Sequence, residues 1–183
     1  YPLYPISVNL SRKHMEQPHL ASHLAGIVDS YGVDHSLIEF ELTETAAYDN
    51  QKYMVYVMNE LRNKGFLISM DDFGTGYSNF HYLYQLSPDT IKIDRSFTVK
   101  ALNNTYEYSL LRHMVEMSHS IDMKLCIEGI ETRSELDKIS EMGPDYIQGY
   151  YTGKPSPEII KEIDPEIKKE IIWANPLFGQ ERN

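Results

Sequence analysis

Cysteine is almost absent from this sequence, and so are long apolar runs. The single cysteine, Cys126, cannot form an internal disulfide, and no cysteine cluster exists that could bind zinc or an iron–sulfur centre. We therefore expect a reducing, cytoplasmic setting. No apolar run approaches the roughly 18 to 20 residues that span a bilayer, and no segment resembles a secretory signal peptide.

Positive charge is also scarce. The chain has 17 Lys and Arg residues against 27 Asp and Glu residues, which gives a formal net charge of −10. Such a balance argues against binding of DNA or RNA by bulk electrostatics. A nucleotide substrate would need its phosphates held locally, by metal ions or by a few well-placed cations.

The length and composition favour one domain over residues 1–183, because 183 residues with 42% hydrophobic side chains can bury one core. The chain opens with Tyr1 rather than Met and leads almost directly into an apolar strand. We therefore expect it to be a piece of a longer protein, which could itself be tethered to a membrane.

Apolar runs and amphipathic patterns alternate along the chain. The runs predict six buried strands, at residues 6–9, 37–42, 66–70, 90–93, 124–127 and 146–150. The patterns predict helices over residues 19–31, 51–63, 106–121 and 132–142, the last with a capping box formed by Thr132 and Glu135. A last helix around Trp173 is expected to pack back onto the body. Strands and helices that alternate in this way indicate parallel βαβ units.

Polar residues fall at the carboxyl end of strand after strand, which helps to choose between an open doubly wound sheet and a barrel. The active-site rim of a TIM barrel is assembled from many strand ends, whereas an open sheet concentrates its site at one switch point. We therefore predict an α/β fold of the (β/α)8 TIM-like barrel type. About six of the eight βα units are present in this chain.

The rim offers oxygen ligands together with one cation, Lys92. The oxygen donors are Asn9, Glu41, Glu44, Asp71, Asp72, Glu128 and Glu131. Hard oxygen ligands without cysteine or clustered histidine suit Mg²⁺ or Mn²⁺. So many carboxylates on one rim would repel one another unless cations neutralised them. Each could instead be solvated or structural, but their shared placement at strand ends favours a metal site.

The segment 69–77 carries the strongest local signal. Asp71 and Asp72 can share one ion only where the strand has ended, because successive strand residues point to opposite faces. We expect the strand to end at Met70, and Gly74 and Gly76 to permit a tight loop after it. The alternative interpretation is an ordinary turn rich in Asp and Gly.

Six segments, in order, resemble the motifs of the EAL-domain family, the bacterial cyclic di-GMP phosphodiesterases. The segments are Val8-Asn9-Leu10-Ser11, Glu41-Leu42-Thr43-Glu44, Asp71-Asp72-Phe73-Gly74-Thr75-Gly76, Lys92-Ile93-Asp94, Glu128-Gly129-Ile130-Glu131-Thr132 and Gln148-Gly149-Tyr150. The resemblance runs from about residue 6 to about residue 157. It implies hydrolysis of cyclic di-GMP to linear pGpG with two divalent ions, Mg²⁺ or Mn²⁺.

The resemblance also implies a role for each motif residue. Asn9, Glu41 and Asp71 would hold the first ion, and Asp71, Asp72 and Glu128 the second. Lys92 would orient the attacking water, Glu128 would help to deprotonate it, and Glu44 would anchor the loop after Asp72. The resemblance thus implies a catalytic set of Lys92, Glu128, Glu44 and Asp72. The substrate pocket would be completed by Gln148, Glu131, Asp94, Gly74, Thr75 and Gly76.

The Glu-Ala-Leu motif that names the family is missing, because it lies upstream of the Asn-x-Ser segment and the chain begins after that place. Its Glu is a ligand of the first ion in the family. We expect a protein that begins at Tyr1 to be poorly soluble or to exchange elements with a second copy, since two strands are absent, and to hydrolyse cyclic di-GMP little or not at all. The upstream residues of the full-length protein should restore folding and turnover.

Two alternatives to a phosphodiesterase of this family stay open. One is an EAL-like cyclic di-GMP receptor or protein-interaction module that has lost turnover, and the other is a different metal-dependent barrel phosphodiesterase, which would fit the ligands but not the motif order. The resemblance further implies a homodimer, and upstream regulatory or GGDEF-type domains in the full-length protein.

Overall fold

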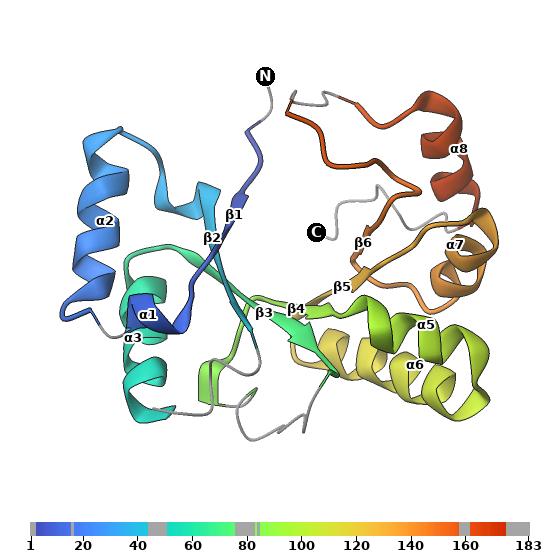
Figure 1. The fold of residues 1–183 in the computed structure, drawn as a ribbon, viewed down its shortest axis with the longest axis horizontal. Coiled ribbons are helices and arrows are strands. Elements are labelled where there is room, and N and C mark those ends of the chain that lie inside the picture. Colours follow the sequence, from blue (N-terminus) through green and yellow to red (C-terminus); the bar gives the residue numbers. More distant parts are fainter. Residues whose placement is uncertain are drawn as a thin grey trace. The chain divides into compact units, whose positions relative to one another are not determined.

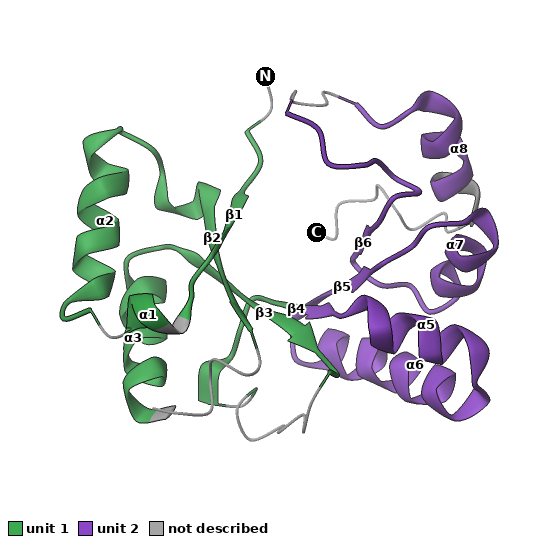
Figure 2. Ribbon diagram, viewed as in Figure 1, with its two compact units in different colours: residues 1–91 green, residues 92–183 purple. Residues whose placement is uncertain are grey.

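The computed structural model describes residues 3–15, 17–43, 51–75, 83, 85–157 and 162–174. The chain divides into two compact units, residues 1–91 and 92–183, shown in different colours in Figure 2. The boundary falls inside strand β4 (Thr90–Ile93), so each unit contains half of that strand. Strands and helices alternate within both units, as the sequence predicts.

Three parallel strands form the sheet of the first unit. They are β1 (Ile6–Asn9), β2 (Ile38–Thr43) and β3 (Leu67–Phe73). Helices connect them: α1 (Arg12–Met15), α2 (Leu20–Ser30), the short 3-10 helix η1 (His35–Leu37) and α3 (Gln51–Asn63). Helices α2 and α3 pack against each other (Figure 1). The first unit is therefore built from helical crossovers between parallel strands.

The two faces of this sheet differ in chemistry. Phe40 and Leu42 alternate along β2, lie opposite Ile68 and Met70 of β3, and are buried with them. Since the side-chain period of a strand is two, the intervening residues point to the other face. Those residues are Glu39, Glu41 and Thr43 in β2 and Ser69 and Asp71 in β3. One face is thus an apolar core layer, and the other carries the polar side chains.

The second unit contains the parallel pair β5 (Lys124–Glu128) and β6 (Tyr146–Gln148). Its helices are α5 (Arg95–Asn103), α6 (Thr105–Ser120), α7 (Arg133–Ser140) and α8 (Pro165–Ala174). Helix α5 packs on α6, and α7 packs on α8 (Figure 1). The predicted capping box of Thr132 and Glu135 is confirmed at the start of α7. None of the helices that the structure describes has both the length and the apolar character that a membrane crossing requires.

Strand order follows sequence order from β1 to β6. This order lacks the reversal that creates a switch point in an open doubly wound sheet, so it favours the barrel. Strand β1 stands at the first position of the order, and all four of its residues are exposed, including Ile6 at 65% and Val8 at 42%. The expected exchange of elements with a second copy and the expected poor solubility both stay predictions.

Among the elements that the structure describes, the sequence predicts all six strands but misses three short helical segments. They are α1, η1 and α5. Helix α5 shows no apolar stripe because its buried residues are Thr98 and Ala101, neither of which marks a core face. Asp94, whose side chain accepts a hydrogen bond from the Ser96 N–H at 2.8 Å, is the local signal that begins this helix.

Helix α8 confirms the expected last helix, and polar contacts attach it to Tyr151 and to α7 within the second unit. The Tyr151 hydroxyl donates a hydrogen bond to Glu170 of α8, and Arg133 of α7 pairs with the same carboxylate, 3.0 Å from Nη1 to Oε2. Arg133 also bonds Asp137 through Nε at 2.8 Å. The hydrogen bonds from Tyr151 and Arg133 lower the pKa of Glu170, and the bond to Glu170 raises the pKa of Tyr151.

We predict that the attachment of α8 weakens in acid. Because the folded-state pKa of Glu170 is depressed, its contacts add stability above the unfolded glutamate pKa of about 4.3, and this stability is lost as pH falls through the folded value. Hydrogen–deuterium exchange of the α8 amides, corrected for the intrinsic effect of pH, measures how firmly this helix is attached. Exchange in the wild type should rise in acid, whereas Glu170→Gln should show the raised exchange already at neutral pH.

The matched control is Glu166→Gln, which removes an exposed carboxylate of the same helix paired only locally, with Lys169. This variant should keep the wild-type acid transition. Identical pH profiles for wild type and Glu170→Gln would contradict the role of Glu170.

Candidate functional site

The carboxyl ends of β1, β2 and β3 bring three predicted ligands to one face of the sheet. Asn9 pairs in register with Glu41, and Thr43, two residues beyond Glu41, pairs with Asp71. Because residues two apart in a strand share a face, Asn9, Glu41 and Asp71 all belong to the polar face. Glu41 is only 7% exposed. An amide oxygen and two carboxylates there form the kind of donor set that Mg²⁺ or Mn²⁺ accepts.

The backbone turns at Asp72, but the strand does not end where the sequence predicts. Strand β3 continues through Phe73, three residues beyond Met70. The turn comes instead from Asp72 itself, whose φ of 56° is in the left-handed region. The Asp72 carbonyl then accepts hydrogen bonds from the Thr75 N–H at 3.3 Å and the Thr75 hydroxyl at 2.9 Å. This conformation frees Asp72 from the strict alternation that would point it away from Asp71.

Backbone strain at Asp72 is held in place by its neighbours. Phe73 is 1% exposed and anchors the turn in the core, and Gly74 follows with a φ of 95°. A left-handed conformation costs a residue with a Cβ about 1–2 kcal/mol, and such strain clusters at functional sites. The roles that the resemblance assigns to Asp72 and Gly74 stay predictions.

An ion pair joins the predicted catalytic residues of the second unit. Lys92 of β4 and Glu128, the last residue of β5, lie 2.9 Å apart, from Nζ to Oε1. Their side chains are 11% and 17% exposed, so the charges are largely removed from solvent. Gln148 pairs in register with Glu128 and so shares its face. The structure thus gathers Lys92, Glu128 and Gln148 at neighbouring strand ends.

A second ion pair, between Arg95 and Glu131, was not expected from the sequence. The distance from Arg95 Nη2 to Glu131 Oε1 is 2.7 Å. Arg95 crosses close to Gly129, where a Cβ would lie 2.6 Å from the Arg95 Cβ, and Gly129 has a φ of 82°. No sequence signal identifies Arg95, although it follows the Lys92-Ile93-Asp94 motif directly. Glu131 is therefore held beside the strand end rather than free in solvent.

The other predicted residues are placed as follows. Asp94 uses Oδ1 to cap α5, and a role in the substrate pocket stays a prediction. Thr75 belongs to the turn that begins at Asp72. Glu44 and Gly76 lie outside the described residues, so the predicted anchoring of the loop by Glu44 also stays a prediction. Among the described residues, no three His, Cys, Asp or Glu side chains gather closely enough to bind a metal ion on their own.

Gly149 fixes the segment that follows β6. A Cβ at this position would lie 2.7 Å from the carbonyl carbon of Ile130. Ile130 is bound on both sides of this contact: its N–H donates to the Gln148 carbonyl at 3.2 Å, and its carbonyl accepts from the Tyr151 N–H at 3.0 Å. The two motif segments that carry Glu131 and Gln148 are therefore held together by backbone contacts that leave no room for a side chain.

We predict that Gly149→Ala destabilises the protein by about 1–3 kcal/mol, because the added methyl group must displace backbone. Gly26→Ala is the matched control, since a Cβ there meets nothing within 4 Å and alanine is favoured over glycine inside a helix. Unfolding in urea measures both variants. Equal stability of Gly149→Ala and Gly26→Ala would contradict the close backbone approach.

The amino-acid sequence matches a known protein family. The family model described as EAL domain matches residues 1–155. The chain is 31% identical over 151 residues to "Probable cyclic di-GMP phosphodiesterase PdeA" of Escherichia coli, which covers 82% of this chain and 21% of that protein. The chain thus spans about a fifth to a third of the length of the curated relatives it matches.

Solved structures share the fold. The PaMucR phosphodiesterase in its c-di-GMP complex superposes with a TM-score of 0.77 at 28% identity, covering 84% of this chain and 62% of that chain. Klebsiella pneumoniae BlrP1, in a manganese and cy-diGMP complex, gives a TM-score of 0.78 at 23% identity, covering 84% of this chain and 39% of that chain. These likenesses confirm the predicted α/β fold of the TIM-like barrel type.

Proposed function

The chain belongs to the EAL domain family, and on that premise we propose that it supplies the catalytic residues of a cyclic di-GMP phosphodiesterase, which opens one phosphodiester bond to give linear pGpG. The observation that carries this proposal is the placement of Asn9, Glu41 and Asp71 on one polar face at three neighbouring strand ends. PdeA and PaMucR are named as phosphodiesterases, which supports the reaction type.

The residues fit two divalent ions, Mg²⁺ or Mn²⁺, by their donor chemistry. Asn9, Glu41 and Asp71 would hold one ion, and Asp71, Asp72 and Glu128 the other. When bound, such ions neutralise charge on the scissile phosphate and lower the pKa of water. Asp71 would bridge the two sites, so its negative charge matters to both.

Lys92 and Glu128 would handle the proton and the charge that develop during hydrolysis. Glu128 would accept a proton from the attacking water, and the Lys92 ammonium, 2.9 Å from its carboxylate, would orient that carboxylate. Gln148 and Glu131, on adjacent segments, would then contact the substrate. Hydrolysis of a phosphodiester requires positioning and charge neutralisation more than covalent catalysis, which suits this set of residues.

We further propose that the full-length protein is a homodimer with additional regulatory domains, GGDEF-type domains among them, and works in the cytoplasm. The curated relatives are several times longer than the matched segment, which supports additional domains. The single cysteine, Cys126, supports a reducing compartment.

Product analysis tests the reaction. The full-length protein is incubated with cyclic di-GMP in Mg²⁺, in Mn²⁺ and in excess chelator, and the nucleotides are separated by chromatography. We expect pGpG with either metal and none in chelator. Saturable binding without product in any metal would establish the receptor alternative, and undiminished product in chelator would rule out the proposed use of metal ions.

A further inference from the structure

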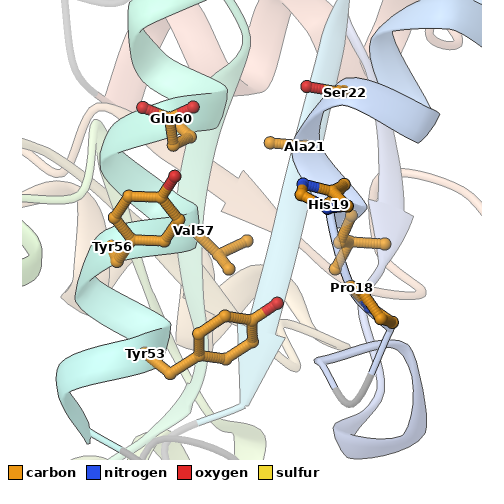
Figure 3. A pocket seen from close by; sticks show the side chains of 9 residues that line it. Pro18, His19, Ala21, Ser22, Tyr53, Tyr56, Val57 and Glu60 are labelled. Atoms are coloured by element: carbon orange, nitrogen blue, oxygen red, sulfur yellow. The ribbon is translucent and has the colours of Figure 1, made fainter.

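The first unit carries a hollow that none of the predicted catalytic residues lines. It has a volume of about 300 Å³ and lies between the start of α2 and the first turns of α3 (Figure 3). Tyr53, Tyr56 and Glu60 contribute from α3, and His19 and Ser22 from α2. The hollow is therefore a separate candidate for binding a ligand.

The α3 wall combines two aromatic rings with a carboxylate. Tyr53, Tyr56 and Glu60 recur at helical spacing, so they share one face of α3 (Figure 3). The rings of Tyr53 and Tyr56 have centroids 6.3 Å apart and planes inclined by 27°. The Tyr53 hydroxyl donates to the Gln17 carbonyl at 3.0 Å, which fixes that ring, whereas Tyr56 is 58% exposed. A ligand would thus meet an exposed aromatic face one helical turn from a carboxylate.

The α2 wall supplies hydrogen-bonding groups. His19 precedes the helix with a φ of 58°, in the left-handed region, and its side chain does not cap the helix. Figure 3 shows the His19 ring and the Ser22 hydroxyl facing the space opposite α3. Within the described part of the chain, the side chains of His19, Ser22, Tyr56 and Glu60 make no hydrogen bond or ion pair. These groups are available to a ligand.

The charges decide the class of ligand. Glu60 and the net charge of −10 disfavour an anion, and a purely apolar ligand would leave the carboxylate unused. A guanidinium group uses both features of the α3 wall, because its plane stacks on a tyrosine ring and its N–H groups pair with a carboxylate. Peptide carbonyl oxygens beside it would accept hydrogen bonds from Ser22 and lie near the positive end of α2. An arginine residue within a peptide offers the cation and the acceptors together.

We propose that this hollow binds an arginine side chain presented by a peptide segment of a partner protein. The guanidinium stacks on Tyr56 and pairs with Glu60, while the peptide oxygens contact the α2 wall. The interaction is independent of the proposed phosphodiesterase activity, since it uses no residue assigned to catalysis.

Titration of the full-length protein with short capped peptides tests this proposal. The probes are acetyl-Gly-Arg-Gly-amide and the same peptide with citrulline, which keeps the shape of arginine but lacks its charge. We expect the arginine peptide to bind at least about tenfold more tightly, as measured by calorimetry, since the cation supplies both main contacts. Equal affinity for the two peptides would overturn the proposal, and this comparison requires no variant.

Three variants locate the site. Glu60→Gln and Tyr56→Ala should each weaken the arginine peptide by about tenfold or more, whereas Tyr56→Phe keeps the ring face and should bind like wild type. Hydrolysis of cyclic di-GMP should be unchanged in all three. Unchanged binding in Glu60→Gln would overturn the site, and agmatine binding as tightly as the peptide would overturn the assignment of a peptide ligand.

Discussion

Replacing Asp71 with asparagine is expected to lower the turnover of cyclic di-GMP by at least about two to three orders of magnitude, roughly 3 to 4 kcal/mol of transition-state stabilisation. The substitution keeps the shape of the side chain and removes its charge. Asp71 stands on the same face as Asn9 and Glu41. Because we propose that it contacts both divalent ions, one substitution should weaken both.

Steady-state rates across a range of Mg²⁺ and Mn²⁺ concentrations measure this effect. Asp122→Asn is a suitable control, because Asp122 lies in the turn after α6 with a φ of 55°, a conformation that asparagine tolerates. It should retain wild-type turnover. Wild-type rates in Asp71→Asn at saturating metal would show that Asp71 is not a ligand.

Replacing Lys92 with alanine should lower kcat by about 100-fold and change substrate affinity far less. Lys92 and Glu128 lie 2.9 Å apart with side chains that are 11% and 17% exposed. Loss of the ammonium removes this ion pair, so the Glu128 carboxylate loses one of the contacts that orient it. The effect therefore falls on the chemical step.

Binding isotherms recorded where no product forms separate the two contributions. An affinity loss that accounts for the whole kinetic loss would mean that Lys92 only clamps phosphate. Lys100→Ala, an exposed lysine of α5, controls for the removal of one positive charge. Thermal unfolding of both variants shows how much of the change arises from destabilisation.

The strands were the most predictable part of the fold. Apolar runs identify each of the six strands in the described part of the chain, and the run that contains the buried Ile91 and Ile93 is an example. Helix α5 escaped prediction because Thr98 and Ala101 form its buried face. The predicted end of β3 at Met70 was wrong for a different reason. The strand continues to Phe73, and the sequence does not reveal that Asp72 takes a left-handed conformation inside it.

The sequence indicated which residues could form the site, but not their contacts. The position of Asn9, Glu41 and Asp71 at strand ends follows from the apolar pattern, and the observed register adds that they share a face. The ion pairs Lys92–Glu128 and Arg95–Glu131 depend on the packing of neighbouring strands and loops. The sequence shows that position 149 is a glycine, but only the structure shows that the Ile130 backbone lies too close to Gly149 for a side chain to fit.

The most direct test of the central claim is to count the metal ions bound by the full-length protein in the presence of cyclic di-GMP. Titration with Mn²⁺, followed by electron paramagnetic resonance of the free ion, gives the stoichiometry and the affinity. The account predicts two ions per chain in the wild type and a loss of affinity at both sites in Asp71→Asn, because we propose that this residue would help to hold both ions. Two ions bound with unchanged affinity in Asp71→Asn would contradict it.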